Sequence, residues 1–324
     1  MIQDSWNRTI EYVRVSLTEA CNFCCPYCRP EIITADSQTN LLKPEEWLVV
    51  LEAFYKLGIN AVRLTGGEPL LYPGLETLLA GLQEKQWFSD ISMTTNGSLL
   101  AARAERLHNL GLQRVNISFD AVDEPTFDFR TGCKGQMDSV VAGIEAAVRT
   151  GFRSVKLNTV LMETMSDDKV KALLDFMEQW PVVWRFIEYM PFQGDTYKGP
   201  TFEEWKAQLE RVAGGPLTPV QTDVSMGRGP ATYYTLPNGR MVGFIFPMSH
   251  TYCDSCNRVR LTSDGKLRLC LLRDEEVDLA EAVRLGADSE TLMGIIADAL
   301  QLRKAEHDGA DMETPKRPMW RIGG

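Results

Sequence analysis

The chain has 324 residues, of which 44% are hydrophobic, and its formal net charge at neutral pH is -10. This length and composition suffice for one large α/β domain with a smaller appendage, or for two ordinary domains, and they exclude a disordered or fibrous protein. The acidic balance argues against a nucleic-acid partner, and the absence of an apolar run of about 18 residues argues against a membrane segment, so we expect a cytoplasmic protein.

From Glu11 onward, short apolar runs alternate with amphipathic stretches, which predicts βα units around a parallel sheet. The predicted strands are Tyr12–Leu17, Ala61–Thr65, Asp90–Thr94, Arg114–Phe119, Ser154–Leu161 and Val182–Glu188. The predicted helices are Pro44–Leu57, Leu75–Lys85, Ala101–Leu110, Gln136–Thr150 and Asp168–Trp180. Because a closed barrel needs eight units, these elements predict an α/β fold with a partial (β/α)6 TIM-type barrel, whose ligands gather beyond the carboxyl ends of the strands.

The pattern changes near Pro191, beyond which one more helix is predicted at Phe202–Val212. The dipeptides Asn238-Gly239 and Asp264-Gly265 each separate two strand-like runs and so predict antiparallel hairpins. The stretch Val277–His307 is again helical in pattern. We therefore divide the chain into a barrel, residues 1–213, and a C-terminal extension of hairpins and helices, residues 214–324.

Eight cysteines in a chain without an export signal indicate metal or redox chemistry before disulfides. Cys21, Cys25 and Cys28 lie within eight residues, on a loop that leaves the first predicted strand. Three thiolates can hold three corners of a [4Fe-4S] cluster and leave one iron open to another ligand. A structural zinc site with Cys24 as its fourth ligand is the alternative, although adjacent cysteines such as Cys24 and Cys25 make poor tetrahedral partners.

This Cys-x3-Cys-x2-Cys loop, with an aromatic residue before its last cysteine, resembles the radical S-adenosylmethionine (SAM) superfamily. The turn Thr65-Gly66-Gly67-Glu68-Pro69 after the second predicted strand resembles the Gly-Gly-Glu motif of the same superfamily. The resemblance implies a [4Fe-4S] cluster on the three cysteines and SAM as the second cofactor. It also implies four residues in contact with SAM, namely Tyr27, Gly67, Ser118 and Met190.

A second set of three cysteines follows near the end of the chain, at Cys253, Cys256 and Cys270, with the third carried across a predicted hairpin. Three thiolates would again leave one iron open, and an open iron is a Lewis acid that could bind a nitrogen or oxygen of a substrate. A zinc site closed by His250 or another residue is the alternative.

The residues around this second set, Ser249–Leu261 and Asp264–Leu271, resemble the GTP 3′,8-cyclase family of molybdenum-cofactor synthesis, as do Arg185–Met190, Gly229-Pro230-Ala231 and the final Gly323-Gly324. The resemblance implies two [4Fe-4S] clusters, SAM and the conversion of GTP to (8S)-3′,8-cyclo-7,8-dihydroguanosine 5′-triphosphate. It further implies a cellular one-electron reductant and transfer of the product to the next pathway enzyme, cyclic pyranopterin monophosphate synthase. A homodimer is compatible with the sequence, which does not determine the oligomeric state.

Basic residues would hold the substrate, because guanidinium groups bind phosphate oxygens in pairs. The resemblance implies the substrate-binding set Arg14, Arg63, Thr94, Lys156, Arg185, Arg258, Val259 and Arg260. Of these, Arg258 and Arg260 are also implied in catalysis together with the tail residues Gly323 and Gly324. The residues themselves support part of this set, because Arg14, Arg63 and Lys156 lie in otherwise apolar strands and an inward-facing cation there needs an anionic partner.

Two other functions stay open at this point: another radical SAM enzyme with an auxiliary cluster, such as a peptide-modifying maturase, and a non-catalytic iron-sulfur or zinc protein. The sequence departs from the family pattern at Ala20, Cys24, Tyr72 and Trp320, where arginine is frequent at the first three positions and a smaller residue at the last. These departures bear on substrate identity more than on the reaction class. Cys133 lies outside both cysteine sets, and we expect it to be a packed or surface thiol.

Overall fold

The computed structural model describes residues 1–28, 40–190, 199–221, 226–306, 317 and 319–322. Its strands are β1 Tyr12–Ser16, β2 Ala61–Thr65, β3 Asp90–Thr95, β4 Arg114–Ser118, β5 Ser154–Leu161, β6 Val183–Glu188, β7 Thr218–Val220, β8 Thr232–Thr235, β9 Met241–Ile245, β10 Arg258–Leu261, β11 Lys266–Arg268 and β12 Glu276–Asp278. Its helices are α1 Pro44–Lys56, α2 Leu75–Lys85, α3 Ala104–Asn109, α4 Glu124–Thr131, α5 Met137–Thr150, α6 Asp167–Met177, α7 Phe202–Ala213, α8 Leu279–Arg284 and α9 Ser289–Gln301, with short 3-10 turns η2 Pro69–Leu71 and η4 Met319–Arg321. In these residues, no helix is both long and apolar enough to cross a membrane.

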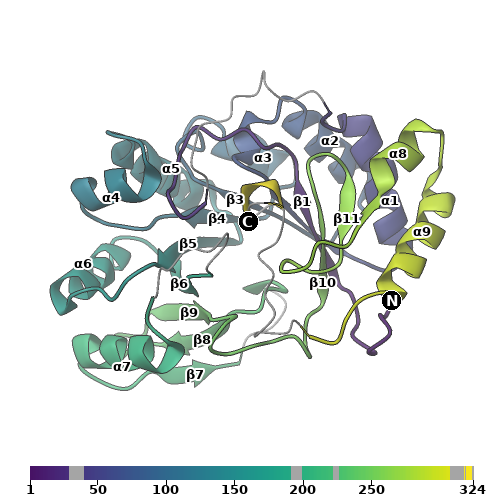
Figure 1. Ribbon diagram of the computed structural model, residues 1–324. Coiled ribbons are helices and arrows are strands. Elements are labelled where there is room, and N and C mark those ends of the chain that lie inside the picture. Colours follow the sequence, from purple (N-terminus) through teal and green to yellow (C-terminus); the bar gives the residue numbers. More distant parts are fainter. Residues whose placement is uncertain (29–39, 191–198, 222–225, 307–316, 318, 323–324) are drawn as a thin grey trace.

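One sheet organises the described residues, with its strands in the order β12-β11-β10-β1-β2-β3-β4-β5-β6-β9-β8-β7. Every neighbouring pair from β10 to β9 is parallel, and the pairs outside this central part are antiparallel. Helices α1 to α7 surround the sheet, and α8 and α9 pack beside α1 (Figure 1). The sheet is a partial barrel, because β9 and β10 end the parallel part without pairing to each other in the described residues.

All six predicted barrel strands are confirmed to within one residue, and the predicted helices to within three residues. Local chemistry explains the helix ends. Helix α1 begins at Pro44, where a missing N–H costs nothing, and the side chain of Glu46 accepts a 2.7 Å hydrogen bond from the amide of Lys43. Glycines in the left-handed region follow several helices, for example Gly151 with φ of 82° after α5.

Both predicted hairpins form, but one strand of each also extends the barrel. Strand β9 pairs in parallel with β6, and β10 pairs in parallel with β1. The prediction of six parallel strands therefore counted too few, since the described residues contain eight. The boundary that we placed between residues 213 and 214 stays a prediction, and the strands on its two sides share one sheet.

The helical stretch expected over 277–307 is interrupted. It contains strand β12 and the separate helices α8 and α9. Gly286, with φ of 93°, follows the end of α8, and the side chain of Asp288 accepts a 2.9 Å hydrogen bond from the amide of Thr291 to start α9. The sequence pattern missed helix α4, whose start is capped by Asp123.

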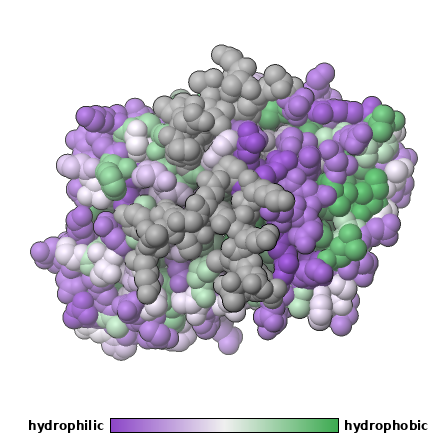
Figure 2. All heavy atoms as spheres, viewed as in Figure 1, coloured by the Kyte–Doolittle hydropathy of each residue, from purple (hydrophilic) through white to green (hydrophobic). Residues whose placement is uncertain are grey.

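The apolar core lies between the sheet and its helices and includes fully buried Trp47, Trp184 and Trp205. The interior of the barrel differs from this core, because many buried side chains on the inner face of the parallel strands are polar or charged. In Figure 2, polar side chains dominate the viewed face, with a smaller apolar area toward α9. A polar barrel interior is expensive to form, which points to a ligand site there.

Candidate functional site

The first cysteine loop leaves the carboxyl end of β1 and is held by the Gly-Gly-Glu turn that follows β2. The amide of Gly67 donates to the carbonyl of Thr18 at 2.7 Å, and the amide of Glu68 donates to that of Ala20 at 2.7 Å. A Cβ atom at position 67 would lie 2.3 Å from the carbonyl oxygen of Ala20. The turn therefore requires glycine for close contact with the cysteine loop itself.

The three thiols of this loop lie close enough to affect one another. Cys21 is buried, and Cys25 and Cys28 are partly buried. Burial raises the pKa of Cys25 well above its usual value, and the charges of Cys28, Asp120 and Cys21 raise it further. Thiolates in such surroundings need positive charge close by, which a cluster of iron ions supplies.

Tyr27 and Asp120 form a buried pair beside these thiols. The hydroxyl of Tyr27 donates to Oδ2 of Asp120 at 2.6 Å, and the amide of Val160 donates to Oδ1 at 2.8 Å. Burial raises the pKa of both groups. Sequence reasoning selected Tyr27 but missed Asp120, although an acidic residue just beyond the end of β4 was a usable signal.

Glu68 is fully buried and joins the ends of two strands. It accepts hydrogen bonds from the amides of Asn96 and Leu70, at 2.7 and 3.0 Å, and from the hydroxyl of Thr95 at 2.7 Å. Burial raises the pKa of Glu68 to about 7, even though these hydrogen bonds favour the carboxylate. The contacts fix the Gly-Gly-Glu turn against the end of β3.

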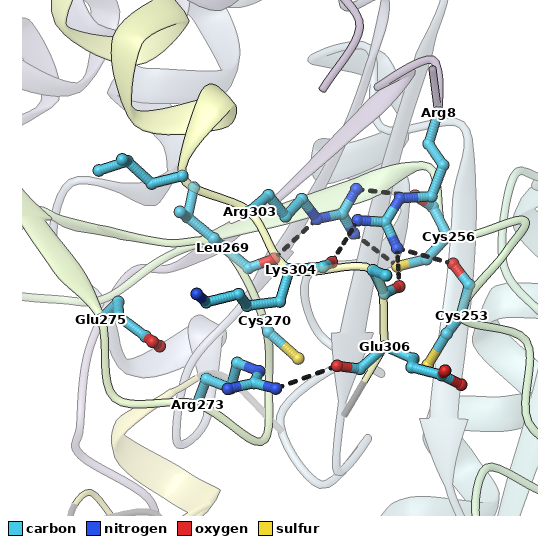
Figure 3. A pocket seen from close by; sticks show the side chains of 12 residues that line it. Arg8, Cys253, Cys256, Leu269, Cys270, Arg273, Glu275, Arg303, Lys304 and Glu306 are labelled. Atoms are coloured by element: carbon cyan, nitrogen blue, oxygen red, sulfur yellow. Dashed lines mark hydrogen bonds between the residues drawn. The ribbon is translucent and has the colours of Figure 1, made fainter. Parts of the chain in front are cut away.

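The three cysteines of the second set line one cavity, in the segment that runs from β9 through β10 to the loop after β11. Figure 3 shows the sulfurs of Cys253, Cys256 and Cys270 around this cavity. Glu188, at the end of β6, accepts the amide hydrogens of Met248 and Ser249 and so anchors the chain that leads to Cys253. The structure thus brings together three thiols that are spread over 18 positions of the sequence.

A buried ionic network supports the second set. Nη2 of Arg303 donates to Sγ of Cys256 at 2.8 Å, and Nη1 of Arg303 donates to Asp4 at 3.0 Å (Figure 3 shows Arg303 beside Cys256). Asp4 also accepts from Nε of Arg8 at 2.7 Å, and Arg8 donates to the carbonyl of Cys253 at 3.0 Å. Burial alone would raise the pKa of Cys256, but Arg258 and Arg303 hold it below its usual value. The thiolate form, which binds metal, is therefore favoured.

Among the described residues, no group of three His, Cys, Asp or Glu side chains is arranged to hold a single metal ion. The structure therefore gives no support to a mononuclear zinc site at either cysteine set.

Four arginines, Arg14, Arg63, Arg258 and Arg260, lie together inside the barrel, and we call them the four-arginine cluster. They come from neighbouring strands, since Arg14 on β1 lies in register with Arg63 on β2 and with Arg260 on β10. Tyr12 lies among them, with its ring centre 5.4 Å from the guanidinium carbon of Arg63 and 5.9 Å from that of Arg258. Burial alone would raise the pKa of Tyr12, yet the four-arginine cluster lowers it to about 7. This part of the barrel is strongly electropositive.

Lys156 and Arg185 extend the electropositive interior along β5 and β6. Nζ of Lys156 donates to the hydroxyl of Tyr233 at 2.8 Å, and Nη2 of Arg185 donates to Asn116 at 2.7 Å. Burial lowers the pKa of Lys156 to about 5, with Arg185, Arg114 and Arg63 contributing. Within the described part of the chain, Arg63, Lys156, Arg185 and Arg258 form no salt bridge with Asp or Glu. Buried basic groups without acidic partners favour an anionic ligand.

The remaining predicted site residues lie in different places, and not all of them are among the described residues. Thr94 and Ser118 lie on β3 and β4, in register with Asn116 and Asn158. Met190, expected to contact SAM, lines a cavity with the second cysteine set, Arg258 and Arg260. The side chain of Val259 packs in the apolar core, so only its backbone could reach a ligand. Gly323 and Gly324 lie outside the described residues, while η4 just before them is tied to the first cysteine loop by a 3.4 Å ion pair between Arg321 and Glu19.

Two of the departures from the family pattern have a structural explanation. Tyr72 is buried, and its hydroxyl donates to the carbonyl of Leu42 at 2.7 Å, so it fixes the start of the segment that enters α1. Trp320 is 7% exposed, and the guanidinium group of Arg321 lies over its indole ring. The guanidinium carbon is 4.9 Å from the ring centre. Both residues are packed parts of the structure.

Known proteins resemble the chain along its whole length. Residues 15–177 match the model of the radical SAM superfamily, and residues 182–309 match the model described as Molybdenum Cofactor Synthesis C. Proteins named GTP 3′,8-cyclase from Thermodesulfovibrio yellowstonii and Moorella thermoacetica are 39% and 38% identical, with 100% of both chains covered in each case. Human molybdenum cofactor biosynthesis protein 1 is 36% identical, over 98% of this chain and 50% of that protein.

A solved structure supports the fold. Streptococcus suis SuiB bound to precursor peptide SuiA superimposes with a TM-score of 0.62 at 15% identity, over 89% of this chain and 67% of that chain. SuiB bound to SAM gives a TM-score of 0.59 and is covered over 63% of its length. At this identity the likeness concerns the fold alone.

Proposed function

The chain belongs to the GTP 3′,8-cyclase family of radical SAM enzymes, and from this premise we propose how its residues carry out the conversion of GTP to (8S)-3′,8-cyclo-7,8-dihydroguanosine 5′-triphosphate in molybdenum-cofactor synthesis. The observation that carries the proposal is the joint presence of two three-thiol sets and a buried cationic interior in one barrel. The rival reading as a non-catalytic zinc protein explains neither the interior cations nor the resemblance to cyclases over the full chain.

Cys21, Cys25 and Cys28 hold the [4Fe-4S] cluster, which with SAM supplies the carbon radical that starts the reaction. The protein contributes placement. Gly67 lets the Gly-Gly-Glu turn pack directly against the cysteine loop, and the hydrogen bond from Tyr27 to Asp120 fixes the ring next to Cys25 and Cys28. We assign Tyr27 and Gly67 to the SAM site. We assign Ser118 to the same SAM site.

Cys253, Cys256 and Cys270 hold a second [4Fe-4S] cluster in this proposal. The support is the shared cavity, the thiolate favoured at Cys256, and the inclusion of Arg258, Arg260 and Met190 in that cavity. With three protein thiolates, one iron is left to a nitrogen or oxygen of the guanine base. Arg258 and Arg303 offset part of the charge of the Cys256 thiolate, and Arg8 holds the backbone of Cys253.

GTP occupies the electropositive interior, with its phosphates on the four-arginine cluster, Lys156 and Arg185. A triphosphate brings about four negative charges, and guanidinium groups bind its oxygens in pairs. Thr94 and the backbone of Val259 complete the contacts, and we assign Gly323, Gly324, Arg258 and Arg260 to catalysis. A one-electron reductant and transfer of the product to cyclic pyranopterin monophosphate synthase belong to this proposal, as does a cytoplasmic location.

An anaerobic nucleotide assay tests the proposal. The reconstituted enzyme is mixed with reductant, SAM and one nucleoside triphosphate at a time, and 5′-deoxyadenosine and nucleotide loss are measured together. We expect 5′-deoxyadenosine formation together with loss of the nucleotide only when the nucleotide is GTP. Formation of 5′-deoxyadenosine with GTP left intact would instead favour a peptide substrate.

Lys156 makes substrate binding depend on protons. Because its pKa is about 5 in the ligand-free protein, Lys156 is neutral at pH 7, and a bound triphosphate favours the charged form. We expect GTP binding at pH 7 to take up as much as about one proton per chain, measured as the dependence of the binding enthalpy on the ionisation enthalpy of the buffer. Uptake should be smaller in Lys156→Met, and equal uptake in the variant and the parent would contradict the assignment.

Lys156 also makes the free energy of unfolding depend on pH. The usual pKa of lysine is 10.5, so between about pH 5 and pH 10 the unfolded chain binds a proton that the folded, ligand-free chain lacks. The contribution of Lys156 to the free energy of unfolding therefore rises with pH across this window. Urea denaturation of Lys156→Met across the same range should show a weaker rise.

A further inference from the structure

Cys24 and Cys133 are the two cysteines that belong to neither three-thiol set, and they meet in space. The amide of Cys24 donates to the carbonyl of Thr131 at 2.8 Å. A Cβ atom at Gly132 would lie 3.2 Å from Cβ of Cys24, and Sγ of Cys133 lies 3.4 Å from the carbonyl oxygen of Asn22. Two chain segments are thus in contact at both cysteines, one from the first cysteine loop and one that follows α4.

The surroundings of the thiols divide the cysteines into two groups. The charged neighbours of Cys25 include Cys28 and Cys21, whereas the thiol neighbour of Cys133 is Cys24. Cys24 thus lies on the side of the loop that contacts Cys133, and adjacent side chains of an extended segment point in different directions. Cys24 and Cys133 are both partly exposed, so small reagents can reach them.

We propose that Cys24 and Cys133 form a redox-active thiol pair that closes to a disulfide when the protein meets a small-molecule disulfide. One thiol loses its proton and attacks the reagent, which gives a mixed disulfide and releases one reagent thiol. The second cysteine loses its proton and attacks the mixed disulfide, so that the Cys24–Cys133 bond forms and the second reagent thiol leaves. The two cysteines are oxidised by two electrons, and the reagent disulfide is reduced to two thiols.

Closure would fasten the first cysteine loop to the end of α4. That loop carries three proposed cluster ligands, and the amide of Cys24 already joins it to Thr131 at the end of α4. A link between distant segments restricts the conformations of the loop once iron is lost. It also prevents Cys24, which is adjacent to Cys25 in the sequence, from forming a disulfide with a cluster ligand.

The test uses the reconstituted holoprotein, treated without oxygen with oxidised glutathione, then alkylated, digested and analysed by mass spectrometry. The expected product is a peptide linked through Cys24 and Cys133, lighter by two hydrogens than its parts. Cys24→Ser and Cys133→Ser are matched variants in which the remaining cysteine should keep one glutathione. A pair of separate glutathione adducts in the parent protein, links from Cys24 to Cys21, Cys25 or Cys28, or no reaction at either thiol would each overturn the proposal.

The disulfide proposal rests on the proposed function in one respect: six cysteines are assigned to the two clusters, which leaves Cys24 and Cys133 for the disulfide. Iron content and SAM cleavage of Cys133→Ser test the assignment separately. They should equal those of the parent protein whether or not the disulfide forms.

Discussion

Replacement of Cys25 by alanine is expected to abolish SAM cleavage and to remove about half of the iron, whereas replacement of the adjacent Cys24 should preserve both. Cys25 lies among Cys21, Cys28 and Asp120, and its thiol is a proposed cluster ligand. Two remaining thiolates cannot hold a four-iron cluster firmly. Loss of groups that only support a ligand typically lowers activity about 10- to 100-fold, so loss of the ligand itself should exceed that range. Iron analysis and 5′-deoxyadenosine formation measure the two effects.

Cys24→Ala is a demanding control because it changes the neighbouring residue on the same loop. Its amide still donates to Thr131, since alanine keeps the backbone. A third variant, Cys256→Ala, should also lose about half of the iron but still produce some 5′-deoxyadenosine, because the first set is intact. If Cys25→Ala and Cys256→Ala both fail to form 5′-deoxyadenosine, the two cysteine sets do not have the separate roles assigned to them.

The sequence pattern was sufficient for six of the eight parallel barrel strands, and it showed both cysteine sets, whose role as cluster ligands stays a prediction. Strands such as Ala61–Thr65 are apolar runs bounded by turn signals, and parallel strands buried on both faces have this appearance. The cysteine sets were visible because the ligands of an iron-sulfur cluster often lie close together in the sequence, on short loops. These strands could be predicted because their cause, a buried apolar run between turns, is local.

Contacts between distant segments were not accessible in this way. A hairpin signal at Asp264-Gly265 says that β10 turns back on β11, but it does not show that the other edge of β10 pairs with β1. The network around the second cysteine set joins Asp4 and Arg8 with Arg303, and each of these residues has an unremarkable sequence context. Such partners are selected by the three-dimensional packing of the two chain ends.

Charge inside the barrel has a price in stability that the substrate can offset. The four-arginine cluster gathers like charges around Tyr12, and burial lowers the pKa of Arg14 well below its usual value, with repulsion from Arg260 next in effect. Like charges in a medium of low polarity repel strongly. A ligand with several negative charges reverses this balance, so the ligand-free protein is expected to unfold more readily than the GTP complex.

Arg14→Met should therefore change stability and binding in opposite directions. Removing one guanidinium relieves repulsion and should raise the free energy of unfolding of the ligand-free protein by about 1 kcal/mol or more. It also removes a charge-assisted hydrogen bond to phosphate, worth about 1.5–3 kcal/mol, so GTP affinity should fall about 10- to 150-fold.

Urea denaturation and calorimetric titration with GTP measure the two effects of Arg14→Met. Arg106→Met is the control, because the side chain of Arg106 is 70% exposed and pairs with Glu76 on the surface, so its loss should change either quantity by less than about 1 kcal/mol. If Arg14→Met lowers stability as well as affinity, the side chain supports the barrel through packing, and the interior is not held in an electrostatically strained state for its substrate.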